Sequence, residues 1–264
     1  RGRYSEEIER AKKFILATQT EKGLFVSPAP SHGPMYEHAL ATLACAELYG
    51  MDPDPTLDAR LRSAVNLIVS AQNPNGGWRY EPAPGDHDLS VTAMQIIALR
   101  AAQNAEIPVP ELTFRRAIDY VRSCAHHTGG FGYLPGGAPN PQMSAAGTLS
   151  LQLLGVYDDE HVARTLDEFA KLPVEWRGGE VTYFYYFHYY AAQVHYQAGG
   201  KHWNEWRPKI RTLLIDHQNT DGSWDVPPNT AEVVETVGPR KIYWTAMASL
   251  VLEVYMHYLP AYQR

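Results

Sequence analysis

Cysteine is scarce in this chain, with Cys45 and Cys124 the two examples among 264 residues. Both fall inside stretches with helical spacing, and they lack the paired spacings of a zinc site or a disulfide framework. We therefore expect two buried structural thiols.

Positive charge is also in short supply, with 23 Lys and Arg against 29 Asp and Glu and a net charge of -6. Affinity for nucleic acid or an anionic membrane depends on clustered cations, so we expect no nucleic-acid partner. No apolar run reaches the length of a transmembrane helix, so no transmembrane segment is expected. With 45% hydrophobic residues, the chain can nevertheless bury a large core.

Several catalytic signatures are absent as well. The sequence contains no nucleophile elbow, Walker motif or Rossmann fingerprint. The Gly-rich stretch 135–141 has too many prolines to cradle a phosphate. The chain begins with Arg1 and not Met, so a targeting segment upstream would be unseen, and localisation stays open.

What the sequence does contain is a repeated phrase, Gln-x-x-x-Gly-x-aromatic. Three copies begin at Gln19, Gln72 and Gln218, and a fourth, from Ala125 to Phe131, keeps only the glycine and the aromatic residue. The steps from Gln19 to Gln72 and from Gln72 to Ala125 are both 53 residues. A fixed period of this size indicates one supersecondary unit copied along the chain.

Each phrase separates two helices of different character. The stretch before it is amphipathic, which is typical of an exposed helix with one buried stripe. The stretch after it is apolar nearly all round, as in residues 143–156, which carry no formal charge and should be buried. In the fourth pair the phrase has decayed to residues 172–180, so that pair is assigned from its position. The pattern predicts five pairs of an outer and an inner helix: 6–18 with 36–49, 59–71 with 89–104, 114–125 with 143–155, 161–172 with 183–197, and 206–217 with 241–258.

Tandem Gln-x-x-x-Gly-x-Trp/Phe phrases followed by small-residue-rich inner helices resemble the repeats of the prenyltransferase and squalene-cyclase (terpenoid cyclase) superfamily. The resemblance covers essentially the whole chain. It implies one all-α domain over residues 1–264, an α/α toroid with an inner and an outer ring of helices and a cavity at one end. Five pairs are one fewer than is usual in that family, so we expect a gapped ring or a further pair outside this chain. The resemblance also implies a structural role for the repeat residues Gln19, Gln72, Gln218, Phe25, Trp78, Phe131 and Trp224.

The resemblance also locates the family's metal position. Protein prenyltransferases of this family hold zinc with an Asp-x-Cys pair and a histidine. The corresponding residues here are Thr182 and Trp244, which cannot replace a thiolate or an imidazole ligand. We therefore expect no zinc and no other cofactor.

Class II terpene cyclases of the family protonate an alkene with the central acid of an Asp-x-Asp-Asp motif. The segment from Asp86 to Leu89 approximates that motif without its last aspartate. The resemblance thus implies Asp86 and Asp88 as candidate catalytic residues. Asp88 also suits a helix N-cap, where a carboxylate is favourable, and both interpretations stay open.

The other candidate residues stand at the starts of inner helices, where a toroid would open. An aromatic face on helix 183–197 can line a cavity and stabilise a cation, stack on a sugar, or simply pack between helices. Polar residues of the first and last inner helices could bind a ligand or form a salt-bridged seam. The predicted ligand-binding residues are Glu37, His38, Tyr183, Tyr186, Arg240, Tyr243 and Trp244.

Three functions remain open from the sequence. The first is a toroid that binds an apolar or isoprenoid-like small molecule, with metal-independent cyclase or isomerase chemistry. The second is a non-catalytic module that binds a protein or polymer. The third is a carbohydrate-active toroid, which would need paired carboxylates beside aromatic platforms.

Overall fold

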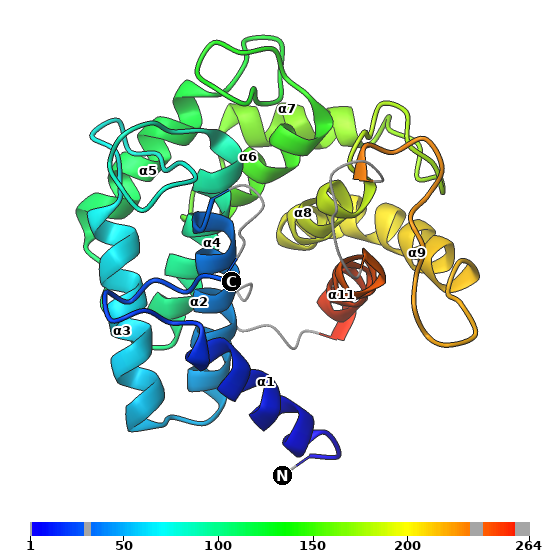
Figure 1. Ribbon diagram of the computed structural model, residues 1–264. Coiled ribbons are helices and arrows are strands. Elements are labelled where there is room, and N and C mark those ends of the chain that lie inside the picture. Colours follow the sequence, from blue (N-terminus) through cyan, green and yellow to red (C-terminus); the bar gives the residue numbers. More distant parts are fainter. Residues whose placement is uncertain (1, 29–32, 233–239, 257–264) are drawn as a thin grey trace. The chain divides into compact units, whose positions relative to one another are not determined.

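A computed structural model describes residues 2–28, 33–232 and 240–256 of the chain (Figure 1). Within these ranges the secondary structure is helical, apart from isolated β-bridges. The chain folds into two units, residues 1–122 and residues 123–264.

The five predicted helix pairs are present in the described ranges. The outer helices are α1 (Ser5–Ala17), α3 (Pro55–Ser70), α5 (Glu111–Ser123), α7 (Glu160–Phe169) and α9 (Gly200–Asp216). The inner helices are α2 (Met35–Met51), α4 (Leu89–Asn104), α6 (Pro141–Leu153), α8 (Phe184–Ala198) and α11 (Arg240–Glu253), followed by the 3₁₀ turn η1 (Val254–Met256). None of the described helices is long and apolar enough to cross a membrane.

Packing within each unit separates inner from outer helices. In the first unit α2 packs against α4, and α3 covers both. In the second unit α8 packs against α6 and α11, while α7 lies against α6 and α9 against α8. The helices α4 and α6 are buried along almost their whole length, and their only charged residue is Arg100, in the last part of α4.

The repeated phrase forms the same turn in four copies. In each copy the glycine N–H donates to the carbonyl three residues before it, and the glycine has a positive φ between 84° and 111°. Only glycine adopts this conformation without a steric penalty. At Gly76 a side chain is excluded twice over, because a Cβ would also lie 2.0 Å from the carbonyl oxygen of Arg116.

The aromatic residue of the phrase fixes the turn to the following inner helix. The N–H of Trp78 donates to Thr92 Oγ1 at 2.9 Å, and the N–H of Phe131 donates to Ser144 Oγ at 3.0 Å. The corresponding acceptors for Phe25 and Trp224 are a histidine, His38, and a threonine, Thr245. The structural role predicted for the repeat residues thus has a physical basis in main-chain hydrogen bonds.

Helix α9 departs most from its predicted range, because it begins at Gly200 and not near residue 206. Pro208 therefore lies inside the helix, where a proline is usually unfavourable. Aromatic packing against α8 accompanies the longer helix: Trp203 lies edge-on to Tyr196, and Trp206 stacks on His195 at 4.7 Å between ring centroids.

The two cysteines are free and buried, as predicted. Burial raises the pKa of the Cys45 thiol to about 12, so this side chain stays protonated at neutral pH.

Candidate functional site

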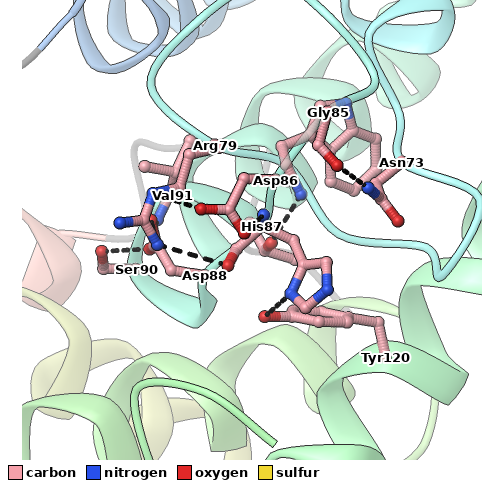
Figure 2. A network of polar contacts seen from close by, with 11 residues as sticks. Asn73, Arg79, Gly85, Asp86, His87, Asp88, Ser90, Val91 and Tyr120 are labelled. Carbon is pink, nitrogen blue, oxygen red and sulfur yellow. Dashed lines mark hydrogen bonds and ion pairs between the residues drawn. The ribbon is translucent and has the colours of Figure 1, made fainter.

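Asp88 is the N-cap of α4 and is fully buried. Its Oδ1 accepts a hydrogen bond from the N–H of Val91 at 2.9 Å and another from the hydroxyl of Ser90 at 2.6 Å. The N-cap interpretation from the sequence is therefore confirmed. Figure 2 shows that the carboxyl group is also part of a wider polar network.

Arg79 joins the two candidate catalytic carboxylates. Its side chain lies 3.5 Å from Asp88 Oδ2 and 3.6 Å from Asp86 Oδ2, and its guanidinium also stands over the ring of Tyr80. Asp86 is 70% exposed, whereas Asp88 is 0% exposed. Of the two carboxylates, only that of Asp88 is thus shielded from water.

A chain of hydroxyl groups connects Asp88 to the first inner helix. Tyr36 Oη lies 2.6 Å from Ser90 Oγ. Because the single hydroxyl hydrogen of Ser90 is donated to Asp88, Tyr36 must donate to Ser90. The phenol of Tyr36 therefore reaches the carboxyl group through one intervening side chain.

His87, between the two aspartates, points away from them. Its Nδ1 lies 3.1 Å from Tyr120 Oη, and the two rings meet edge to face at 4.9 Å (Figure 2). This contact ties the loop to α5 and leaves His87 outside the contacts of Asp88.

Glu37 and His38 hold the loop before α2. Glu37 accepts hydrogen bonds from the N–H and the hydroxyl of Ser27 at 2.7 and 2.8 Å. His38 accepts from the N–H of Phe25 through Nδ1, and its Nε2 lies 3.2 Å from the carbonyl of Ala64. Burial lowers the pKa of His38 to about 4, so the ring is neutral. Both ring nitrogens of His38 therefore make polar contacts within the fold.

In the second unit, polar groups converge on the start of α8. Glu232 Oε1 accepts from the N–H of Tyr185 at 2.9 Å and from that of Tyr186 at 3.1 Å. Glu232 is 4% exposed, and burial raises the pKa of its carboxyl to about 7 against the opposing effect of these hydrogen bonds. Tyr183 occupies the N-cap position of α8. When the side-chain amide of Gln142 is oriented with its oxygen toward α8, this oxygen accepts a hydrogen bond from the N–H of Tyr183.

The remaining candidates lie on α8 and α11. The ring of Tyr186 packs on that of Tyr190 at 4.8 Å. Burial and the negative charge of Glu232 raise the pKa of Tyr243. Trp244 is buried, and its indole N–H has no hydrogen-bond partner among the described residues. The side chain of Arg240 lies outside the described part of the chain.

Among the predicted residues, the structure thus joins Asp86 and Asp88 through Arg79, whereas Glu37 and His38 bond to other partners. Sequence reasoning missed Arg79, Ser90 and Glu232. Arg79 could have been found from its place directly after the repeat aromatic Trp78, but Glu232 follows no motif and binds main-chain groups about 46 residues away. Within the described ranges, no three His, Cys, Asp or Glu side chains are grouped so that they could hold a metal ion.

Comparison with known proteins identifies the family. Residues 3–177 match the family described as "Prenyltransferase alpha-alpha toroid domain". The chain therefore belongs to this family, and its fold class is the α/α toroid, as the repeats predicted. No curated protein matches the chain.

Solved structures of the type II terpene cyclase MstE from Scytonema share the fold. A variant bound to its substrate, geranylgeranyl dihydroxybenzoate, matches with a TM-score of 0.63 and 14% identity over 95% of this chain and 72% of that one. A variant without ligand matches with a TM-score of 0.64 and 15% identity over 95% and 71%. A further substrate-bound variant gives 0.62 and 16% over 98% and 76%. At such low identity the likeness concerns the fold.

Proposed function

We propose that this chain binds an apolar, isoprenoid-like small molecule and isomerises it by metal-independent acid chemistry, with Asp88 as the proton donor. The observation that carries the proposal is the difference between the two carboxyl oxygens of Asp88. Oδ1 accepts two hydrogen bonds, whereas Oδ2 makes none among the described residues. Oδ1 therefore holds the group in place, and the proposal assigns the proton to Oδ2, whose nearest charged neighbour is the guanidinium of Arg79 at 3.5 Å.

The proposed reaction begins when Asp88 Oδ2 transfers its proton to one carbon of an alkene. The alkene electron pair forms the new C–H bond, and the neighbouring carbon becomes a cation. A second alkene of the same molecule supplies the electron pair of a new C–C bond, which closes a ring and moves the positive charge. Loss of one proton to water restores an alkene, so the product is an isomer of the substrate, and Asp88 takes up a proton again.

The neighbouring residues fit roles in positioning Asp88. Arg79 faces Oδ2, and the exposed Asp86 pairs with Arg79 on the other side. Ser90 and Tyr36 fix Oδ1.

The test uses geranylgeranyl dihydroxybenzoate, the compound bound in the MstE structures, and squalene as a second polyprenyl probe. Purified protein is incubated with each compound in D₂O, and the products are separated and weighed by mass spectrometry. The proposal expects a product with the composition of the substrate that carries one deuterium, because the first proton comes from an acid in exchange with solvent. Asp88→Asn should abolish this product.

Other outcomes distinguish the remaining functions. Saturable binding of the polyprenyl compounds without any product would contradict the catalytic part and favour a non-catalytic binding module. If neither compound binds, the proposal is wrong in both parts. Binding of an oligosaccharide in their place would favour the carbohydrate-active alternative.

A further inference from the structure

The second unit contains a cavity that the sequence did not indicate. Its volume is about 380 Å³, within the range of small-molecule sites. The wall is formed by the loop of the decayed fourth phrase, by the turn at Asn229 and by one side of α8. This cavity contains none of the residues discussed above as candidates for acid chemistry.

The loop that forms one wall of the cavity, residues 173–181, is held in place by main-chain hydrogen bonds. The N–H of Gly178 donates to the carbonyl of Pro228 at 2.7 Å, and the N–H of Ala231 donates to the carbonyl of Thr182 at 2.8 Å. Gly178 approaches Asn229 so closely that a Cβ would lie 1.6 Å from its carbonyl oxygen. The cavity therefore has a defined wall.

The cavity lies on a different side of α8 from the pair of tyrosines. Phe184 and His188, four residues apart, share one face of the helix and line the cavity. Tyr186 and Tyr190 fall on the opposite face, because each residue turns the helix by about 100°. The cavity side of α8 is the side that meets α9, since the ring of His188 faces that of Trp206 at 6.0 Å.

His188 is the unusual member of the cavity wall. It is 3% exposed and packs edge to face against Phe184 at 4.4 Å between ring centroids. Its Nδ1 is buried and has no hydrogen-bond partner among the described residues. Burial lowers the pKa of His188 to about 3, so the ring is neutral and has one donor and one acceptor nitrogen. A buried polar atom without a partner is unfavourable, and a ligand that supplies the partner removes this penalty.

The other wall residues limit the chemistry of such a ligand. Phe184, Val181 and Pro173 supply apolar surface. The rim carries two carboxylates, Glu175 and Glu180, against one guanidinium, and that guanidinium, of Arg177, is already paired with Glu175 at 2.5 Å. The excess of negative charge disfavours an anion. A hydroxyl group can both donate and accept, so it satisfies the imidazole in either tautomer.

We propose that this cavity binds an uncharged, mainly apolar small molecule whose hydroxyl group forms a hydrogen bond with the imidazole of His188. The site is independent of the proposed acid chemistry at Asp88, which lies in the other unit. An experiment that contradicts one of the two proposals therefore does not contradict the other.

The test compares phenol with toluene, which has nearly the same shape without the hydroxyl hydrogen bond, and with benzoate, which carries the disfavoured charge. The protein is labelled with ¹⁵N-histidine, and the ring nitrogens of His188 are assigned through their proximity to the ring of Phe184, which lies 4.4 Å from the imidazole. Phenol should shift the His188 nitrogen resonances saturably and bind about tenfold more tightly than toluene, as expected for one hydrogen bond to a buried group. Benzoate should bind more weakly than phenol.

Two variants separate the site from non-specific binding. His188→Phe keeps a ring of similar shape and should remove the preference for phenol, whereas His127→Phe, at an exposed loop histidine, should keep it. Val181→Phe, which fills the cavity from the other wall, should abolish phenol binding without altering His188 itself. Equal binding of phenol and toluene, or His188 resonances that do not move, would overturn the proposal, and the wild-type titration decides this even if a variant fails to fold.

Discussion

Gln72 Nε2 donates a hydrogen bond at 2.9 Å to the carbonyl oxygen of Thr113, a residue of the next outer helix 41 positions along the chain. The same amide donates to the carbonyl of Gly76 at 2.9 Å. One side chain thus closes its own turn and attaches the following repeat. Gln19 makes the equivalent two bonds, to Gly23 and to Arg60.

Gln72→Ala should therefore lower the free energy of unfolding by about 1–3 kcal/mol, because two buried hydrogen bonds are lost. The measurement is urea unfolding followed by circular dichroism. Gln218→Ala is the matched control, since Gln218 is exposed and its amide donates within its own turn. A loss as large for Gln218→Ala as for Gln72→Ala would show that the bond to the next helix does not matter.

Two substitutions of Asp88 distinguish its role as the N-cap of α4 from its proposed role as a proton donor. Asp88→Ala should lower the free energy of unfolding by about 1 kcal/mol, whereas Asp88→Asn should keep most of the cap. The N-cap of α6 provides the control: Asn140 Oδ1 accepts from the N–H of Met143 at 2.9 Å, as Asp88 does from Val91. Asn140→Ala should cost similar stability and leave turnover of the polyprenyl probes unchanged. Turnover that survives in Asp88→Asn would leave Asp88 with the role of a cap alone.

His38 should make the stability of the protein depend on acid. Its folded pKa is about 4, below the ordinary value of 6.5, so its contribution is fully present above pH 6.5 and is lost as the pH falls toward 4. The shift corresponds to about 3 kcal/mol at most. In urea unfolding between pH 7 and pH 4, His38→Gln should show a shallower decline than the wild type. His127→Gln, at an exposed position, should decline as the wild type does.

Glu232 should make the free energy of unfolding decrease as the pH rises. Its folded pKa of about 7 lies above the ordinary value of 4.5, so its contribution to stability is fully present below pH 4.5 and is lost as the pH rises through 7. Glu232→Gln keeps an acceptor for the N–H groups of Tyr185 and Tyr186 without the charge. This variant should match the wild type near pH 4.5 and exceed its free energy of unfolding at pH 8 by up to about 3 kcal/mol. Glu180→Gln, an exposed carboxylate nearby, should show no such gain.

The sequence predicted most of the helices because their signals are local. Helix α4 begins and ends where it was predicted, since Asp88 marks its start and the largely apolar stretch after it marks its length. Helix α9 was predicted to begin too late, because its first turns depend on contacts of Trp203 and Trp206 with α8 that no local pattern contains.

The candidate site was harder to predict for the same reason. The cap by Asp88 is a local signal and was recognised. The bonds from Glu232 to the start of α8, and the cavity beside His188, arise from segments about 40 residues or more apart, so spacing along the chain carries no sign of them. The ligand-binding roles predicted for Glu37, Tyr183, Tyr243 and the other candidates stay predictions.

The hydrogen bond from the repeat aromatic to the inner helix has a consequence for how such a chain can change over time. The donor is the main-chain N–H of the aromatic residue, and the acceptor is an imidazole in one repeat and a hydroxyl group in three others. This hydrogen bond between the turn and the inner helix therefore requires an acceptor side chain, but no particular amino acid. Substitutions can accumulate on the inward-facing helices, one repeat at a time, while the joints between repeats persist. A scaffold of this kind can acquire a new ligand without first having to find a new fold.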